Sequence, residues 1–247
     1  MGNALAIDAV SVVQGGQRRV ENFSTLLPAG HVHALLGPNG AGKSSLLRAL
    51  VGHPDYAIEE GTVVCDGESL LPLPAELRSM RGLFLAFQSP VELPGVSIAQ
   101  MLRAAKQLRL PKGETLDVLA FQDELFAALD RLAMERCWAN RGVHEGCSGG
   151  EKKRCELLQI LMLKPRYLLL DEMDSGLDRE ALQLVAHVLG ELRMEGTGIL
   201  LVTHQRPLLD LLAPNKILML RGGRLVLSGG VEVLDAWEAG EWCRQRP

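Results

Sequence analysis

A glycine-rich turn between two regular segments constrains this 247-residue chain more than any other feature. Residues 37–44 have the sequence GPNGAGKS, which matches the pattern GxxxxGK[ST]. The apolar run His31–Leu36 before the turn is typical of a buried strand, and Lys43–Leu50 is typical of a helix that ends near Gly52. In this context the backbone N–H groups can surround phosphate oxygens, and the helix N-terminus adds positive potential. The sequence therefore predicts a site for the phosphates of a nucleotide.

The side chains of the turn have different expected roles. Lys43 should reach the β- and γ-phosphates, and the Ser44 hydroxyl should bind Mg²⁺. A glycine-rich turn without a ligand is the alternative, but the complete motif in its expected context argues against it. The predicted nucleotide-binding residues of this segment are Gly37, Pro38, Asn39, Gly40, Ala41, Gly42, Lys43, Ser44 and Ser45.

Two carboxylates follow a second apolar run. Residues 168–170 are all leucine, and Asp171 and Glu172 come directly after them. If this run is a strand buried on both faces, Asp171 lies at its carboxyl end beside the phosphate site, where it can bind Mg²⁺. Glu172 is then close enough to orient or deprotonate the attacking water. Two acids after a strand are more often a helix-capping turn, but the phosphate-binding turn favours a catalytic pair.

The order of apolar segments predicts an α/β fold with a largely parallel sheet. An early antiparallel pair is expected at 4–13 and 20–27, and Gly222-Gly223 should connect a hairpin. Residues 89–165 are expected to form a helical subdomain without strands, inserted into one 1–247 domain whose core is 1–88 and 166–247. The other expected strands are 61–65, 83–87, 167–171, 198–203, 216–220 and 224–228, and the expected helices of the insertion include 98–108, 121–132 and 148–163.

Composition excludes several other classes. The net charge is −4, with 26 basic against 30 acidic residues, and only 4% of residues are aromatic, so we expect no nucleic-acid partner. No apolar run approaches the length of a membrane-spanning helix, and the first residues lack the basic and apolar regions of a secretory signal, so no membrane insertion is expected. Five cysteines without a CxxC pair favour reduced thiols over disulfides or a metal-cluster site. We therefore predict a cytoplasmic protein.

A third motif, which can bind an anion, follows the first two expected helices of the insertion. Residues 147–154 have the sequence CSGGEKKR, and Ser148 is a good helix N-cap whose following glycines leave N–H groups free for an anion. With this motif the chain resembles the ATP-binding-cassette (ABC) ATPase family over nearly its whole length. Ser148, Gly149 and Gly150 resemble the family signature, Gln88 the Q-loop glutamine, Ser175–Asp178 the D-loop, and His204 the switch histidine.

The resemblance implies a fold, a reaction and an assembly. The fold is an α/β P-loop NTPase core with an antiparallel β subdomain and an inserted helical subdomain. The activity is hydrolysis of ATP with Mg²⁺, which Ser44, Gln88 and Asp171 would bind, and Asp178 would contact the nucleotide. Glu172, His204 and Lys43 are the expected catalytic residues. The assembly is an ATP-dependent head-to-tail dimer in which Ser148–Gly150 of one subunit completes the site of the other.

Within the family, four stretches resemble the SufC group of iron–sulfur cluster assembly (SUF) ATPases. They are HPDYAIEEGTV (53–63), FLAFQSPVELPGVS (84–97), VHEGCSGGEKKR (143–154) and DEMDSGLD (171–178). This resemblance implies SufB- and SufD-like scaffold proteins as partners, in a SufBCD-type complex that ATP remodels.

Two departures from the expected pattern stand out. The Tyr expected after His204 is missing, so that Gln205-Arg206-Pro207 follows directly. No aromatic residue occurs between Val10 and Arg19, where the family's adenine-stacking residue is expected, and Phe23 is the nearest one.

Three other functions are compatible with part of the pattern. The ATP-binding subunit of a membrane ABC transporter would share every catalytic residue. A small-molecule kinase would use Gly37–Ser44 but would leave Ser148, Gln88 and His204 unexplained. A nucleotide-gated clamp would bind ATP without hydrolysing it.

Overall fold

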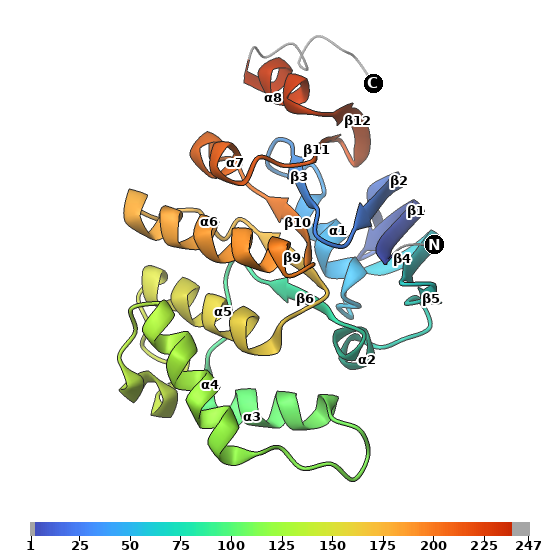
Figure 1. The fold of residues 1–247 in the computed structure, drawn as a ribbon. Helices are drawn as coiled ribbons and strands as arrows, with labels where there is room; N and C mark the ends of the chain where they lie inside the picture. Colours follow the sequence, from blue (N-terminus) through green and yellow to red (C-terminus); the bar gives the residue numbers. More distant parts are fainter. Residues whose placement is uncertain (1–2, 239–247) are drawn as a thin grey trace.

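The computed structural model describes residues 3–238, and its centre is a six-stranded sheet (Figure 1). The strand order is β12-β11-β3-β10-β9-β6. Three of these strands are buried along their whole length, which explains their continuous apolar runs. The six strands, in chain order, are β3 (Val32–Leu36), β6 (Leu83–Ala86), β9 (Tyr167–Asp171), β10 (Gly198–Val202), β11 (Lys216–Arg221) and β12 (Arg224–Gly229).

Most of this sheet is parallel, as predicted. Strand β10 pairs in parallel with β3 on one side and with β9 on the other, and its last residue, Val202, lies opposite Leu35 and Asp171. Strands β11 and β12 form the predicted antiparallel hairpin through Gly222 and Gly223. Because the carboxyl ends of β3, β9 and β10 share one edge, the loops that follow these strands lie close together.

A second sheet is antiparallel and has the order β2-β1-β4-β5. The expected pair at 4–13 and 20–27 is confirmed as β1 (Ala4–Gln14) and β2 (Gln17–Pro28). Strand β4 (Ala57–Cys65) begins four residues earlier than expected. The two-residue strand β5 (Glu68–Ser69) was not predicted, because so short a segment has no periodicity.

Two apolar cores lie on opposite faces of the central sheet. Ala34 and Leu36 of β3 belong to one core, whereas Leu35 belongs to the other, as alternation along a strand requires. Helix α1 packs between the two sheets, and α5, α6 and α7 lie on the far side of the central sheet (Figure 1). These helices are α1 (Lys43–Leu50), α5 (Gly149–Leu163), α6 (Arg179–Met194) and α7 (Arg206–Leu212).

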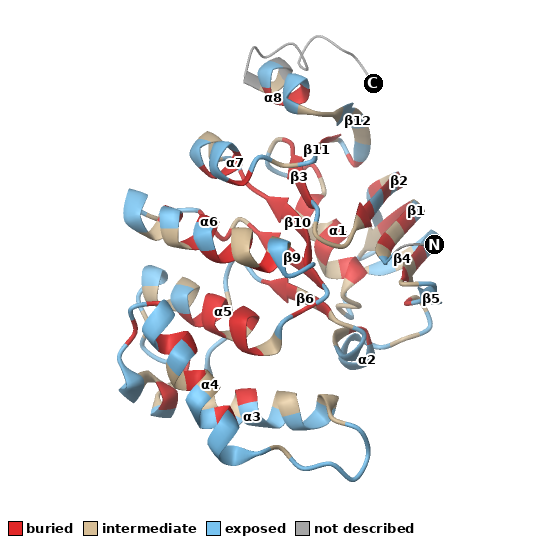
Figure 2. Ribbon diagram, in the orientation of Figure 1, coloured by how far each residue is buried: buried red, intermediate tan, exposed pale blue. Residues whose placement is uncertain are grey.

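The stretch 89–165 is mainly helical but contains two strands, so the prediction that no strand interrupts it was wrong. Strand β7 (Leu93–Ser97) pairs with β8 (Gly142–Val143). Neither gives an apolar strand pattern, because β7 is exposed along most of its length and contains Pro94 and Gly95, and β8 has only two residues. The helices lie together below the central sheet, with exposed outer faces (Figure 2). They are α3 (Ile98–Arg109), α4 (Val118–Arg131), the 3₁₀ helix η1 (Arg136–Asn140) and α5.

Two further helices complete the described chain. Helix α2 (Ala75–Met80) lies beside β6, and α8 (Val231–Glu238) packs on β11 and β12. Over residues 3–238, no helix combines the length and the apolar character that a membrane crossing requires.

Candidate functional site

The turn between β3 and α1 packs so closely that two of its positions require glycine. A Cβ on Gly37 would lie 2.1 Å from the carbonyl oxygen of Leu220, and one on Gly42 would lie 2.5 Å from that of Arg19. Both glycines have positive φ, 149° and 104°, which other residues rarely adopt. Contacts with β11 and β2 therefore fix the shape of the predicted phosphate loop from both sides.

The ammonium group of Lys43 lies across this loop. Its Nζ donates to the carbonyl oxygens of Gly37 at 2.7 Å and Pro38 at 3.1 Å, and the residue is buried. Burial lowers the pKa of Lys43, whereas the nearby charges of Glu172 and Asp171 raise it. A phosphate bound here would add negative charge next to a buried ammonium group whose charge Glu172 and Asp171 only partly balance, which favours binding.

A cavity of about 460 Å³ opens over the loop. Asn39–Ser45 line it together with Gln88 and Glu172. Gln14 and Arg19 line it as well, and sequence analysis missed both because neither belongs to a motif. Phe23, the aromatic residue nearest in sequence to the expected adenine site, is fully buried in the core and does not line the cavity.

Ser44 and Asp171, two of the residues that the sequence predicts to bind Mg²⁺, are in contact. The Ser44 hydroxyl donates to Oδ1 of Asp171 at 2.9 Å. The other oxygen of Asp171, Oδ2, is buried without a hydrogen-bond partner among the described residues. Burial raises the pKa of Asp171, although the Ser44 hydrogen bond opposes the shift. An orphaned carboxylate oxygen beside a hydroxyl is a donor set that fits a hard divalent cation.

Glu172 follows β9 in a strained backbone conformation. Its φ is 51°, in the left-handed region, and its N–H donates to Val202 at 3.1 Å, which holds the turn against β10. Its carboxylate has two partners: Gln88 Nε2 donates to Oε2 at 2.7 Å, and His204 Nε2 lies 3.3 Å from Oε1. Three residues from three predicted motifs therefore meet at one carboxylate.

The shortened segment after His204 forms a regular helix start. Pro207 occupies the first turn of α7, where its missing N–H costs nothing. Thr203 and Asp174 are both buried and are hydrogen bonded to each other, and Gln205 Nε2 donates to the Asp174 carbonyl at 2.8 Å. Asp174 thus bonds the residues before and after His204 and fixes the backbone there, a function that no sequence motif indicated.

The signature residues lie apart from the phosphate loop of the same chain. Ser148 caps α5 through a capping box with Glu151, and Ser148–Gly150 do not line the cavity. Asp178 caps α6 by accepting from the N–H of Ala181 at 2.8 Å and does not line the cavity either. Lys153 of α5 donates to the carbonyl of Ser175, which connects the signature helix to the segment of Asp178.

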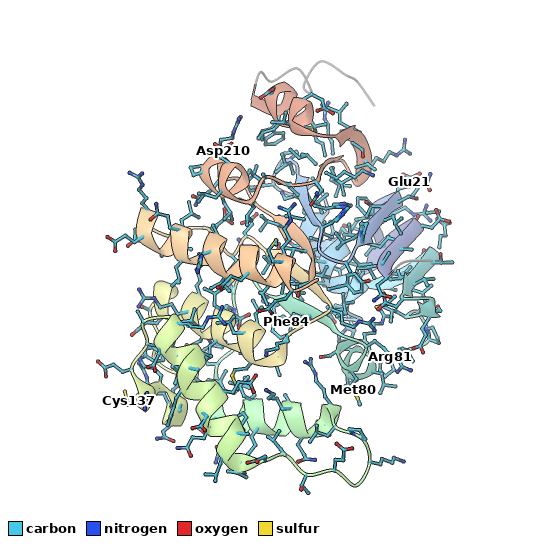
Figure 3. All side chains as sticks on the ribbon, viewed as in Figure 1. Glu21, Met80, Arg81, Phe84, Cys137 and Asp210 are labelled. Atoms are coloured by element: carbon cyan, nitrogen blue, oxygen red, sulfur yellow. The ribbon has the colours of Figure 1, made fainter. Side chains whose placement is uncertain are left out.

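Cys147, next to the signature, lies near a second thiol. Its Sγ donates to the carbonyl of Glu145 at 3.6 Å, and Cys155 is close enough for each thiol to affect the pKa of the other, a proximity that the sequence spacing left open. Burial raises the pKa of Cys155 to about 12. Cys137, by contrast, is exposed at the outer end of the helical region (Figure 3).

Comparison with known proteins identifies the family. The ABC transporter family model matches residues 20–175. Vegetative protein 296 of Bacillus subtilis (strain 168) is 37% identical over 245 residues, which cover 98% of this chain and 94% of that protein. This chain belongs to the ABC transporter ATP-binding family. A chloroplastic ABC transporter I family member 6 from Arabidopsis thaliana is 41% identical over 220 residues, 88% of this chain and 65% of that protein.

Solved structures of ABC cassettes have the same fold. The ATP-binding subunit of an ABC transporter superposes with a TM-score of 0.81 at 23% identity, covering 96% of this chain and 93% of that one. A dimeric cassette bound to ADP and Pi gives a TM-score of 0.79 at 19% identity, covering 92% and 98%. The chain is an ABC ATPase that binds and hydrolyses ATP.

We predict that Asp171→Asn stabilises the nucleotide-free protein by about 1–2 kcal/mol at pH 7, because it replaces a buried carboxylate, whose charged form burial disfavours, with a neutral amide. Because folding raises the pKa of Asp171, there is a pH range above 3.8 in which this residue keeps its proton in the folded state but has lost it in the unfolded state. Stability is therefore lost as pH rises from the ordinary value of 3.8 through the raised value, and the gain in the variant should vanish near pH 4.

Urea unfolding at both pH values measures this difference. Asp123→Asn, an exposed aspartate on α4, is the control and should change stability by less than about 0.5 kcal/mol. The Asp171 variant should also lose Mg²⁺-dependent hydrolysis. A variant that is less stable than the wild type at pH 7 contradicts the prediction.

Proposed function

We propose that this ABC ATPase is the SufC-type motor of an iron–sulfur cluster assembly machine, in which ATP hydrolysis changes the conformation of SufB- and SufD-like scaffold proteins. The observation that carries this proposal is that the two longest SufC-like stretches, 84–97 and 143–154, form one unit. Strand β7 from the first stretch pairs with β8, where Leu93 lies opposite Val143 of the second. Lys152 of the EKKR sequence forms a 2.9 Å ion pair with Glu92 of the PVELPGVS sequence.

This unit has exposed apolar side chains that suit a protein partner. Val91 is 76% exposed, and Phe87, Leu93 and Val96 are also exposed. Apolar side chains gathered in this way are typical of interaction sites. Gln88 lies within the same segment and contacts Glu172, so a partner bound here would act directly on the catalytic carboxylate.

The site residues have the following proposed roles in hydrolysis. Lys43 and the N–H groups of residues 39–45 bind the β- and γ-phosphates of ATP. Glu172 accepts a proton from water as the water oxygen forms a bond to the γ-phosphorus and the bond to the β-phosphate oxygen breaks. Each oxygen of Glu172 has one protein partner, so the attacking water would share the carboxylate with Gln88 and His204 or replace one of them.

Ser44 and Asp171, with Gln88 nearby, would hold Mg²⁺, which supplies charge neutralisation at the phosphate oxygens. His204 contacts the γ-phosphate in the proposed active state. A partner that moved Gln88 away from Glu172 would leave more of the carboxylate to the water, which is consistent with slow turnover in the absence of a partner.

We further propose a head-to-tail dimer around two ATP molecules. Ser148–Gly150 do not line the cavity of their own chain, yet the N-terminus of α5 offers N–H groups suited to a phosphate. A second copy would supply these residues, with Asp178 beside them. We place the complex in the cytoplasm, which the free thiols of the described cysteines support, and expect no nucleic-acid partner at a net charge of −4.

The alternative is the ATP-binding subunit of a membrane ABC transporter. Similar proteins carry that name, including a probable ABC transporter ATP-binding protein of Streptococcus pyogenes serotype M3 at 40% identity over 225 residues, 91% of this chain and 88% of that protein. Its partner would occupy the same segment around Val91. The two hypotheses therefore differ in the partner and not in the chemistry.

Co-purification distinguishes them. The tagged chain, expressed with its neighbouring reading frames, should recover non-membrane scaffold proteins, and Val91→Asp should reduce the recovery. Leu211→Asp, at an exposed position on α7, is the matched control and should not. Recovery of a polytopic membrane protein instead would contradict the SUF proposal and support the alternative.

We predict that Glu172→Gln lowers ATP hydrolysis by at least about 100-fold, because the amide cannot accept the proton of water. ATP binding should persist, since Lys43 and the phosphate loop are unchanged. Steady-state phosphate release and nucleotide-binding titrations measure the two effects, with Glu195→Gln at the end of α6 as the control. A variant that hydrolyses ATP at the wild-type rate would refute the role of Glu172.

We predict that Lys43→Ala and Ser148→Ala, each nearly inactive alone, regain activity when mixed. A mixed dimer combines the intact phosphate loop of the Ser148 variant with the intact signature of the Lys43 variant, and so contains one complete site. Hydrolysis rates across a series of mixing ratios, with each variant alone as the control, measure this recovery. No recovery at any ratio would show that the signature does not act on the opposite subunit.

A further inference from the structure

His204 has a second neighbour besides Glu172. The ring of Trp237, on α8, lies with its centroid 6.5 Å from that of His204 and at an angle of 41°. This distance is within the range in which aromatic rings attract each other. The imidazole therefore lies between the carboxylate of Glu172 on one side and the indole of Trp237 on the other.

The position of Trp237 is set by packing away from the nucleotide site. Val233 and Leu234, one turn earlier on α8, are buried in the larger apolar core, and the helix packs on β11 and β12. Trp237 is partly buried against the same core. The ring is thus held by the body of the protein and not by His204 itself.

Helix α8 also contacts the segment that follows His204. Asp235 lies 3.8 Å from Arg206, which pairs in turn with Asp210 on α7 at 2.7 Å. Figure 3 marks Asp210 on α7, in the region next to α8. These pairs are half-exposed and contribute little energy, but they place α8 against the altered segment Gln205–Pro207.

The opposite side of the segment is fixed by buried polar contacts. Thr203 is hydrogen bonded to Asp174, and the N–H of Gln205 donates to the Thr203 hydroxyl at 2.9 Å. The backbone on both sides of His204 is therefore rigid, whereas its side chain is 36% exposed. Only the rotamer of the imidazole is left for its neighbours to determine.

We propose that Trp237 is a positioning residue for His204, so that the carboxy-terminal helix α8 helps to determine the rate of hydrolysis. The tilted indole beside the imidazole favours the rotamer that points towards Glu172 and the γ-phosphate position. This inference rests on the role of His204 proposed above. It predicts that a change on α8, outside all nucleotide-binding motifs, acts on catalysis through one side chain.

Steady-state kinetics of four variants tests the proposal. His204→Ala alone tests the role of the histidine, and if it hydrolyses ATP like the wild type, the proposed role of His204 fails. Trp237→Ala should lower kcat about two- to tenfold with KM for ATP within about twofold, because the phosphate loop is untouched. Trp237→Phe, which keeps an aromatic ring, should retain most of the rate. Val231→Ala, at an exposed position of the same helix, should not change it.

The double variant Trp237→Ala/His204→Ala provides the decisive measurement. If Trp237 acts through His204, the double variant has the same kcat as His204→Ala. A further loss in the double variant, or a wild-type kcat in Trp237→Ala when His204→Ala is impaired, overturns the positioning role. If Trp237→Ala does not fold, Trp237→Leu takes its place.

Fluorescence gives an independent readout of the contact between the two rings. In a Trp138→Phe/Trp242→Phe background, Trp237 is the remaining tryptophan. Its emission should change when His204 is replaced by Ala and when ATP is added. Emission that responds to neither change overturns the proposal.

Discussion

The parallel pairing of β3, β10 and β9 brings three loops that are distant in the sequence to one edge of one sheet. Val202, at the end of β10, lies opposite Leu35 and Asp171, so the phosphate loop, the acid pair and His204 all follow strands that end at the same level. A shift of register in either pair would move Glu172 or His204 away from the loop. Every contact at the candidate site depends on this arrangement, which backbone hydrogen bonds and two apolar cores hold in place.

Several polar groups are buried at this edge at a cost to stability. Burial shifts the pKa values of Asp171 and Asp174 upwards and that of Lys43 downwards, which means that each charged form is disfavoured relative to water. Asp171 also leaves one oxygen without a partner among the described residues. A ligand that brings phosphate and a cation would pair these buried groups and remove the free-energy cost of burying them. The removed cost would then add to the free energy of binding.

Glu172 joins the other parts of the molecule to the site. Gln88 connects it to the exposed segment around Val91, and His204 connects it to α8 through Trp237. The two routes start from segments that are far apart in the sequence and meet at the two oxygens of one carboxylate. A partner on the helical side and a change in the carboxy-terminal helix would therefore influence the same proton-accepting group.

The sequence by itself determined the family, the α/β class, the early antiparallel pair, the final hairpin and the motif residues that meet around Glu172, because these depend on local patterns of apolar residues, glycines and charges. Strands β7 and β8 were not predicted, since β7 is exposed and contains Pro94 and Gly95 and β8 has only two residues. Only the tertiary structure decided that Gln14 and Arg19 line the cavity and that Phe23 does not. It also decided that Asp174 bonds the residues on both sides of His204, and that Trp237 lies beside the histidine. These contacts join residues far apart in the chain, and their geometry follows from how the sheets and helices pack, which no local pattern encodes.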